Sequence, residues 1–385
     1  MPPHTKSLAV TVAVLLLTVA AARPQGTLDR AGLSALAGYQ VELERYRRVH
    51  DAYLHEHHIY WHEVAGKRRL RNAKRRKHDT IALNDYVLAQ PPVYRGPPAP
   101  VNPLPAPPLP PKPSPVLPVV ANFIEAAKAQ WGFVPRLPKN DAEFKRAYAR
   151  AARAAGLTEA QVVGIYAFET GGNGAYDTQA GVTRKRPRPI SPALGYNQLL
   201  STNTVSLLAE RGNVFLAALA RKERTLDGED RLQMRRKIAA LRRMVAFCRS
   251  LPHRWSTYDR IAKHSAKGWG IHAAVLDLDI GPLLQVQKLI NSVAFARAKG
   301  FQGTLSAPEL ELMNLTGDGN GIDMVLMPQA MRERVPTANF FQPNGYARNP
   351  VARRSKVVSG LIDEIRASME RNEQAAGARE LAAAF

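Results

Sequence analysis

Residues 156–172, which read GLTEAQVVGIYAFETGG, carry the clearest information about the fold. Thr158 and Gln161 have the spacing of a capping box, in which each side chain bonds the backbone N–H of the other residue, so a helix is predicted to begin there. Gly171-Gly172 is predicted to end it, because glycine readily adopts the left-handed conformation that closes helices. The stretch therefore predicts one short helix with a defined start and a defined end.

Ala-rich amphipathic runs of the same kind recur through the rest of the chain, separated by short polar pieces and without strand–helix alternation. The stretch Tyr176–Leu200 is the one place that favours a small hairpin. We therefore predict a mainly α protein with a small β element. The helical runs are 141–155, 158–170, 203–222, 230–251, 283–299 and 356–371.

The first residues have the pattern of a secretory signal peptide, predicted over 1–22. Lys6 precedes an apolar run, 8–22, which closes with three alanines at 20–22. Positive charge, a short apolar core and an Ala-x-Ala site in this order are typical of a leader that is removed on export. The run is shorter than the roughly 20 residues of a bilayer span, and an uncleaved anchor is the alternative. We expect a periplasmic or secreted protein, or one associated with the envelope.

Four further regions are predicted. Residues 23–90 have polar, mostly helical character, and eight of the eleven residues in Lys67–Lys77 are Lys or Arg. That run is either a solvated helix face or an electrostatic tether to an anionic envelope surface. Residues 91–118 contain 14 prolines in 28 positions, which predicts an extended polyproline spacer. Residues 119–371 are the predicted globular domain, and 372–385 a flexible tail.

The composition limits the choice of partner. The chain has 54 Lys and Arg residues against 32 Asp and Glu, a formal net charge of +22, which favours an anionic partner. Export argues against nucleic acid. The single cysteine, Cys248, cannot form an internal disulfide, so stability is expected from core packing.

A pair of histidines is a candidate metal site. His58 and His62 are four residues apart and would share one helix face, as a zinc pair would. The segment lacks the His-Glu-x-x-His order of a metalloprotease. We interpret it as helix surface and expect neither a metal nor a cofactor.

Helix phase places Glu169 among apolar residues. Val162, Ile165, Tyr166 and Glu169 fall at i, i+3, i+4 and i+7, which is one stripe of the helix. Apolar neighbours and the C-terminal end of the helix dipole both raise the pKa of a carboxyl group. A carboxyl group that stays protonated near neutral pH suits a proton donor for glycosidic cleavage. From this segment alone, a structural Glu paired with an Arg is an equally good interpretation.

A second motif follows at residues 190–200, which read ISPALGYNQLL. Taken together with Glu169-Thr170, it resembles the lytic transglycosylase family, whose members have a lysozyme-like fold. That family shows a Glu-Ser pair at a helix end and then a Gly-Leu-Met-Gln motif. Thr170 keeps the hydroxyl of the Ser, and the second motif is matched at Gly195 and Gln198. The resemblance implies a lysozyme-like α-rich domain, with Gly195, Tyr196 and Gln198 at the floor of a substrate cleft.

The third family motif, Ala-Tyr-Asn-x-Gly on a later helix, is matched only in part. Residues 312–317 read LMNLTG and offer Asn314 on a helix predicted to begin at Ser306. The family's Tyr is missing, and Tyr346 is a candidate to replace it from another part of the chain. We therefore include Thr170, Asn314 and Tyr346 among the expected substrate-binding residues.

The resemblance implies cleavage of the β-1,4 bond between N-acetylmuramic acid and N-acetylglucosamine in peptidoglycan. Glu169 would protonate the glycosidic oxygen and then accept the proton of the muramyl C6 hydroxyl, which leaves a 1,6-anhydro end. A muramidase is the first alternative, because hydrolysis ordinarily uses a second carboxylate and Asp177 could supply it. A non-catalytic wall-binding or scaffold protein is the second.

Overall fold

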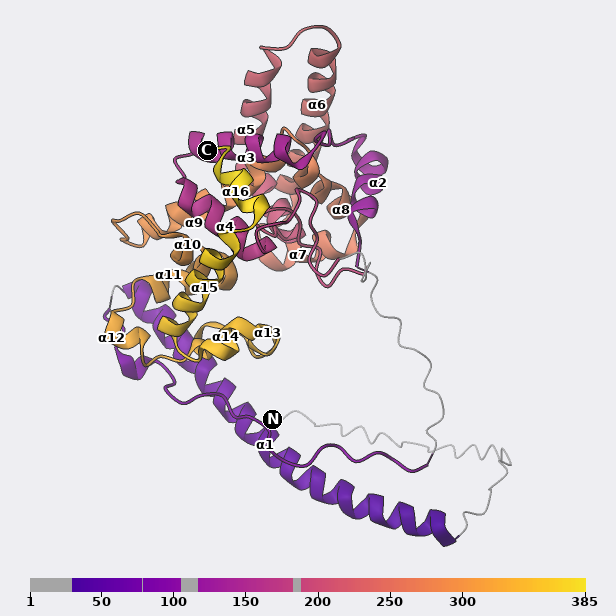
Figure 1. Ribbon diagram of the computed structural model, residues 1–385, viewed down its shortest axis with the longest axis vertical. Helices are drawn as coiled ribbons and strands as arrows, with labels where there is room; N and C mark the ends of the chain where they lie inside the picture. Colours follow the sequence, from indigo (N-terminus) through magenta and orange to yellow (C-terminus); the bar gives the residue numbers. More distant parts are fainter. Residues whose placement is uncertain (1–29, 78, 105–116, 183–187) are drawn as a thin grey trace, which may run out of the picture. The chain divides into compact units, whose positions relative to one another are not determined.

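The computed structural model describes residues 30–77, 79–104, 117–182 and 188–385. The predicted signal peptide, 1–22, lies outside these residues. The regular secondary structure of the described residues is helical, and three isolated β-bridges stand in place of strands (Figure 1). The predicted mainly α class is confirmed. None of the helices described is long and apolar enough to cross a membrane.

The described residues form sixteen α-helices and three 3-10 helices, and the chain divides into two compact units, 1–55 with 93–111 and 56–92 with 112–385. The α-helices are α1 (Arg30–Lys77), α2 (Val120–Trp131), α3 (Asp141–Ala154), α4 (Glu159–Thr170), α5 (Ser201–Glu223), α6 (Gly228–Ser250), α7 (Trp255–His264), α8 (Ala266–His272), α9 (Gly281–Ala298), α10 (Ala307–Thr316), α11 (Asp318–Val325), α12 (Gln329–Arg332), α13 (Pro343–Arg348), α14 (Pro350–Ser355), α15 (Val358–Glu373) and α16 (Ala376–Ala382). The 3-10 helices are η1 (Leu83–Asp85), η2 (Ala273–Leu276) and η3 (Thr337–Phe340).

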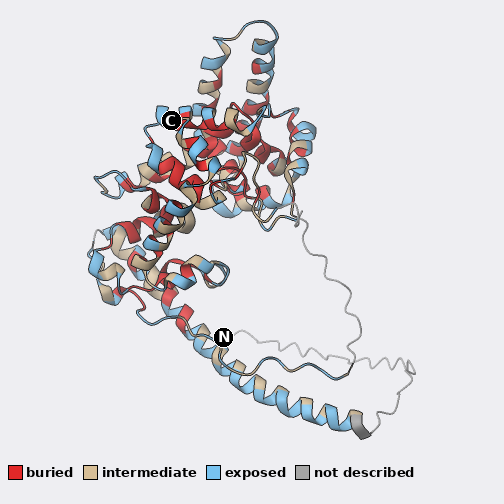
Figure 2. Cartoon of the chain, in the orientation of Figure 1, coloured by how far each residue is buried: buried red, intermediate tan, exposed pale blue. Residues whose placement is uncertain are grey.

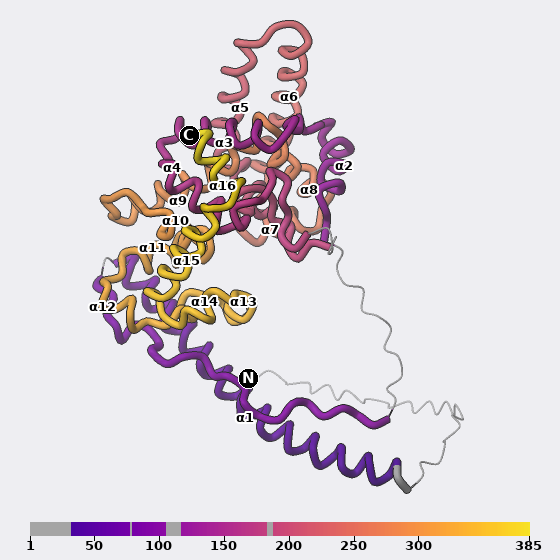
Figure 3. The backbone as a smooth tube through the Cα atoms, in the orientation of Figure 1, coloured from indigo at the N-terminus to yellow at the C-terminus, as the bar shows by residue number. Residues whose placement is uncertain are grey.

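In the smaller unit, an extended segment lies along the N-terminal half of α1 (Figure 3). The ring of Tyr94 packs against Tyr46, His50 and Tyr53, with ring centroids 6.2, 5.5 and 5.4 Å away. The described first part of the predicted proline-rich spacer is therefore attached to a helix through aromatic contacts. Residues 105–116 of that spacer lie outside the described part of the chain.

The larger unit has two apolar cores, and its buried residues concentrate on the inner faces of the helices (Figure 2). One core draws on α3, α4, α9, α10, α11, α15 and α16, and the other on α2, α5, α6, α7 and α8. Cys248 is fully buried in the second core, and burial raises the pKa of its thiol to about 12. Cys248 therefore contributes to the apolar packing of this core.

The basic run Lys67–Lys77 is largely turned toward the protein. Arg68 donates to the carbonyl oxygens of Asn339 and Phe341, and Arg71, only 1% exposed, donates to those of Asp85 and Asn339. Arg71 also lies over the ring of Tyr86, 4.3 Å from its centroid. The interpretation as a free solvated face or tether is therefore wrong for these two arginines, because unpaired carbonyl groups of the 339–341 segment need donors.

The β element expected at 176–200 is reduced to isolated bridges of Leu194 with Gln179 and with Leu199. Leu194 and Leu199 exchange backbone hydrogen bonds of 3.1 and 2.8 Å around a four-residue turn. A longer ladder cannot form here, because Pro192 has no N–H group and α5 begins at Ser201. The expectation of a small hairpin is corrected to a bridged turn.

The last residues are also ordered into the fold. In α16, Ala378 and Leu381 are fully buried, and the ring of Phe385 receives the guanidinium of Arg153 at 5.6 Å. The expected flexible tail over 372–385 is therefore wrong. Ala378 and Leu381 hold α16 in place by packing into the core that α3 and α4 also form.

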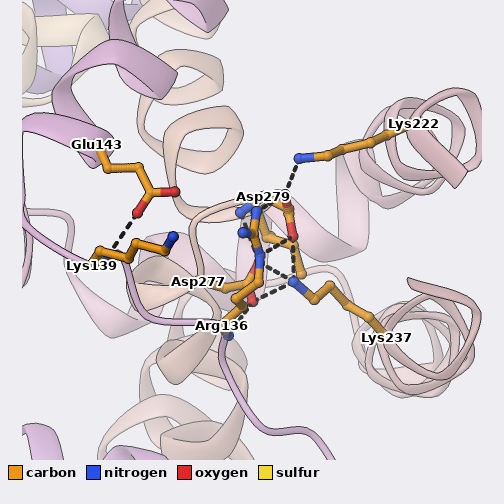
Figure 4. A network of polar contacts seen from close by, with 8 residues as sticks. Arg136, Lys139, Glu143, Lys222, Lys237, Asp277 and Asp279 are labelled. Carbon is orange, nitrogen blue, oxygen red and sulfur yellow. Dashed lines mark hydrogen bonds and ion pairs between the residues drawn. The ribbon is translucent and has the colours of Figure 1, made fainter. Parts of the chain in front are cut away.

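A buried ionic network fixes the segment that leads into α9 (Figure 4). The carboxylate of Asp279 accepts hydrogen bonds from Arg136 at 2.8 Å and from Lys222 and Lys237 at 2.5 Å. Asp277 accepts from Lys237 and from the backbone N–H of Arg136. The network joins α5, α6 and the loop before α3 to the start of α9, the helix that carries two side chains used below.

Candidate functional site

Helix α4 begins and ends as the sequence predicts. The Thr158 hydroxyl accepts from the backbone N–H of Gln161 at 3.2 Å, and the Gln161 side chain accepts from that of Thr158 at 2.9 Å. Gly171, with φ of 67°, follows the last turn in the left-handed conformation. Glu169 is thereby fixed in the final turn of α4, as expected.

Helix α10 runs alongside α4 in the same direction. The Gln161 side chain donates to the carbonyl of Leu305 at 2.7 Å, just before α10 begins. One turn further on, a Cβ added at Gly164 would lie 2.8 Å from Cβ of Ala307, so the backbones approach as closely as a glycine allows. This register brings the last turn of α4 against the second half of α10.

The register places two carboxyl groups and one amide together. Asn314 Nδ2 donates to Oε1 of Glu169 at 2.8 Å, and it lies 3.5 Å from Oε2 of Glu311. The Asn314 amide nitrogen therefore lies between the two carboxyl groups, and the charge of Glu169 acts on Glu311. Glu169 is partly exposed, whereas Glu311 is fully buried. A partly exposed acidic residue is thus backed by an amide and by a second, fully buried acidic residue.

Both carboxyl groups hold their protons unusually strongly. Burial raises the pKa of Glu169 from its ordinary value of 4.5 to about 7, even though hydrogen bonds from Glu311 and Asn314 favour its ionised form. Burial, and next the negative charge of Glu169, raise the pKa of Glu311 well above its ordinary value. Lys288 on α9 and Asn314 act in the opposite direction. Two carboxyl groups this close cannot both ionise easily.

Thr170, the next residue, is turned away from this cluster. Its hydroxyl donates to the carbonyl of Tyr166 within the same helix at 2.6 Å. A Cβ at Gly174 would meet the Thr170 side chain at 2.5 Å, so Thr170 also packs against the loop that follows. Its contacts are those of a helix-terminating residue, and the sequence expectation of substrate contact has no support in them.

The turn at 195–198 serves packing more than binding. The Tyr196 side chain is fully buried, its ring packs against Phe144, Tyr148 and Tyr166, and its hydroxyl donates to Asp141 at 2.8 Å. Burial raises the pKa of Tyr196, and the charge of Asp141 adds to that effect. Tyr196 is thus a core residue, and its assignment to the cleft floor is wrong.

Gly195 and Gln198 have defined backbone roles. Gly195 has φ of 82°, and a Cβ there would come within 2.9 Å of the Gln285 amide, so only glycine fits. Gln198 has φ of 44°, and its amide nitrogen donates to the carbonyls of Gly195 and Thr178 at 2.8 and 3.1 Å. Within the described chain, Gln198 Oε1 is buried without a hydrogen-bond partner. That oxygen is the one unused polar group of this turn.

Asp177 and Tyr346 have other neighbours. Burial raises the pKa of Asp177, and the charge acting on it comes from Asp141 rather than from Glu169. Tyr346 lies on α13, nearly buried, with its ring 5.8 Å from that of Trp61 and 6.1 Å from that of Phe341. The contacts of neither residue connect it to Glu169.

Asn314 is the predicted residue that the structure does place against Glu169, and Glu311 is the one missed. The same stripe rule that located Glu169 would have found it. Ala307, Leu310, Glu311 and Asn314 fall at i, i+3, i+4 and i+7 of α10, whose phase is set by Ser306 and Glu309.

Metal chemistry receives no positive support at the histidine pair. The rings of His58 and His62 stack with centroids 6.4 Å apart. Across the described residues, no three His, Cys, Asp or Glu side chains gather as a ligand set.

Searches against protein families, curated proteins and solved structures found no match to this chain.

Proposed function

We propose that the protein is an exported peptidoglycan lytic transglycosylase with Glu169 as its acid and base, on a domain of the lysozyme-like type. The observation that carries the proposal is the partly exposed Glu169 carboxyl group with a pKa of about 7, hydrogen-bonded to Asn314 at 2.8 Å. A pKa near the working pH lets one group give up and regain a proton with little cost in either state.

The proposed reaction uses one carboxyl group twice. Protonated Glu169 gives its proton to the glycosidic oxygen as the bond from that oxygen to the muramyl anomeric carbon breaks. The C6 hydroxyl oxygen of the same sugar then bonds to the anomeric carbon, and its proton returns to Glu169. No water is consumed, and the enzyme ends in its starting protonation state.

The geometry favours this route over the muramidase alternative. Paired carboxyl groups of glycoside hydrolases are about 5–5.5 Å apart for retention and about 6.5–9.5 Å apart for inversion, which leaves room for the sugar or a water. Glu311, the carboxyl group placed beside Glu169 by Asn314, is fully buried, so it cannot present its oxygens to a sugar or to an attacking water. For Asp177, the carboxylate that the sequence offers, the acting charge is that of Asp141 and not that of Glu169.

The substrate and location in this proposal come from the sequence. Peptidoglycan follows from the resemblance at Glu169-Thr170 and at 195–198, and export from the pattern at 1–22. Arg69, Arg76 and Lys77 remain exposed on α1 and are the groups of the basic run still free to face an anionic envelope surface. Nucleic acid and cofactors have no part in the proposal.

The deciding experiment is digestion of purified sacculi, with mass spectrometry of the released fragments. Wild type should release muropeptides with 1,6-anhydro ends, and Glu169→Gln should release none above background. Glu159→Gln, at an exposed position in the first turn of the same helix, is the matched control and should behave as wild type. Fragments with added water would establish the muramidase instead. Equal release by wild type and Glu169→Gln would exclude catalysis by Glu169 and leave the non-catalytic wall-binding alternative.

A further inference from the structure

Glu311 occupies an unusual position for an acidic side chain. It is fully buried on α10, and in the described part of the chain no N–H or O–H group donates to its Oε1. Its other oxygen lies at the limit of reach of Asn314, at 3.5 Å. An ionised carboxylate placed this way would leave a buried charge poorly satisfied, which costs more than leaving a neutral polar group unpaired. The protonated form avoids that cost if its hydroxyl has an acceptor.

Glu169 is the acceptor within reach. Asn314 Nδ2 lies between the two side chains, 2.8 Å from Oε1 of Glu169, to which it donates, and 3.5 Å from Oε2 of Glu311. Glu169 is also the acidic group whose charge acts on Glu311. An oxygen that receives an amide N–H is oriented as an acceptor, and a carboxylate can accept several such bonds. A protonated Glu311 therefore completes a pair of donors directed at one carboxylate.

The charges around Glu311 agree with a neutral side chain there. From α4 it faces Glu169, and from α9 it faces Lys288. The Lys288 ammonium group is shared, since it lies 3.6 Å from Oδ1 of Asp318 on α11 and donates to Ser292 at 3.4 Å. On the α15 side, Glu373 approaches α4 near Gly164. Lys288 is thus shared with Asp318 and is not a dedicated counter-charge for an ionised Glu311.

We propose that Glu311 is a positioning residue that stays protonated and donates a hydrogen bond to Glu169, stabilising the carboxylate that Glu169 becomes during the reaction. The inference rests on the proposed function of Glu169. Glu311 keeps its proton throughout, so it neither attacks the sugar nor activates water. Its effect is preorganisation, because both donors are in place before negative charge develops on Glu169.

The test separates donation from charge. Glu311→Gln keeps the shape of the side chain and an N–H donor but cannot ionise, whereas Glu311→Leu removes the donor and suits the buried site. Protein labelled with ¹³C at the glutamate carboxyl carbons is titrated by NMR without substrate, and the Glu169 signal is assigned from its loss in Glu169→Gln. Glu311→Met, another apolar replacement of similar length, serves if the Leu variant does not fold.

The expected result is that Glu169 titrates in Glu311→Gln as in wild type. In the Leu variant it should titrate about one pH unit or more higher, since its carboxylate then has one hydrogen-bond donor fewer. Release of anhydro fragments should fall about tenfold or more in the Leu variant and be largely retained in the Gln variant. An unmoved Glu169 signal in the Leu or Met variant would overturn the inference. So would a Gln variant as inactive as Glu169→Gln.

Failure of the inference and failure of the proposed function are distinguishable, because the titration needs no substrate. If Glu169 shows the expected titration shift in Glu311→Leu but wild type releases no sugar, the hydrogen-bond assignment is supported and the lytic function is excluded. If wild type releases sugar but the pKa of Glu169 is unchanged in Glu311→Leu, only the inference about Glu311 is excluded.

Discussion

Asn314 donates a hydrogen bond from its side-chain amide to Oε1 of Glu169 over 2.8 Å, although the two residues are 145 positions apart in the chain. The bond crosses from α10 to α4 at the point where Glu169 becomes accessible. An amide N–H that points at a carboxyl oxygen favours the ionised form, whereas burial favours the protonated form. The pKa of about 7 for Glu169 is the balance of burial, which raises it, against Glu311 and Asn314, which lower it.

The first prediction concerns loss of the Asn314 hydrogen bond, which favours the ionised form of Glu169. Asn314→Leu should raise the pKa of Glu169 above about 7 and lower the rate of anhydro-sugar release about 10- to 100-fold, which corresponds to about 1.5–3 kcal/mol for a hydrogen bond to a charged group. The rate is measured on sacculi between pH 5 and pH 9. Asn320→Leu is the control, because Asn320 donates to the carbonyl of Thr316. An Asn314→Leu pH profile that superimposes on that of wild type would contradict the prediction.

The second prediction concerns stability and pH. The pKa of Glu169 is higher in the folded state than in the unfolded chain, so the folded protein binds that proton more tightly. Stability from this source is fully present below about pH 4.5 and is lost as the pH rises toward 7, the two limits set by the ordinary and the raised pKa of Glu169. Glu311, whose pKa is also raised, extends the loss to higher pH.

Urea unfolding of wild type and of the double variant Glu169→Gln/Glu311→Gln measures this effect. The difference in unfolding free energy between the two should change in favour of the double variant as the pH rises from 4.5 to 8. All other titrating groups are common to both proteins and cancel in the comparison. Parallel curves would show that the two carboxyl groups titrate normally.

The start, end and phase of α4 were predictable from local sequence, because capping and apolar spacing act within one helix. The same is true of α10, and its stripe would have revealed Glu311. The pairing of α4 with α10 was not predictable, since nothing local to Glu169 specifies its partner. The prediction that Tyr196 lines a cleft was wrong for a related reason. A motif fixes residue types, but the tertiary neighbours of an aromatic ring decide whether it faces a cleft or the core. Arginine is ordinarily exposed, so nothing in the sequence indicated that Arg71 lies in the interior. It is buried where it donates to the carbonyl groups of Asp85 and Asn339.

The third prediction tests the contact that sets the α4–α10 register. Gly164→Ala would place a Cβ 2.8 Å from that of Ala307 and 3.2 Å from Sδ of Met369, so the helices must move apart. We expect a loss of about 1–3 kcal/mol in the free energy of unfolding, the usual cost of overpacking, together with a change in the pKa of Glu169. Gly345→Ala is the control, because nothing lies within 4 Å of its new Cβ. Equal stability of the two variants would mean that the crossing is loosely packed.

The last prediction concerns the ionic network that holds the start of α9. Burial alone would raise the pKa of Asp279, but hydrogen bonds and charges from Arg136, Lys237 and Lys222 hold it well below its usual range. Stability from Asp279 is therefore present above its ordinary pKa of 3.8 and is lost as the pH falls, the opposite sense to the glutamate pair.

Asp279→Asn should destabilise the protein by about 3–5 kcal/mol at pH 7, because Lys237, whose side chain is only 9% exposed, loses a buried partner. The deficit relative to wild type should shrink on acidification, because below pH 3.8 the unfolded wild-type chain binds a proton at Asp279 that the folded protein does not bind. Thermal unfolding at pH 3 and pH 7 measures both effects, with Asp230→Asn on the exposed surface of α6 as the control. A deficit that is the same at both pH values would show that the cost comes from altered shape and not from the lost charge.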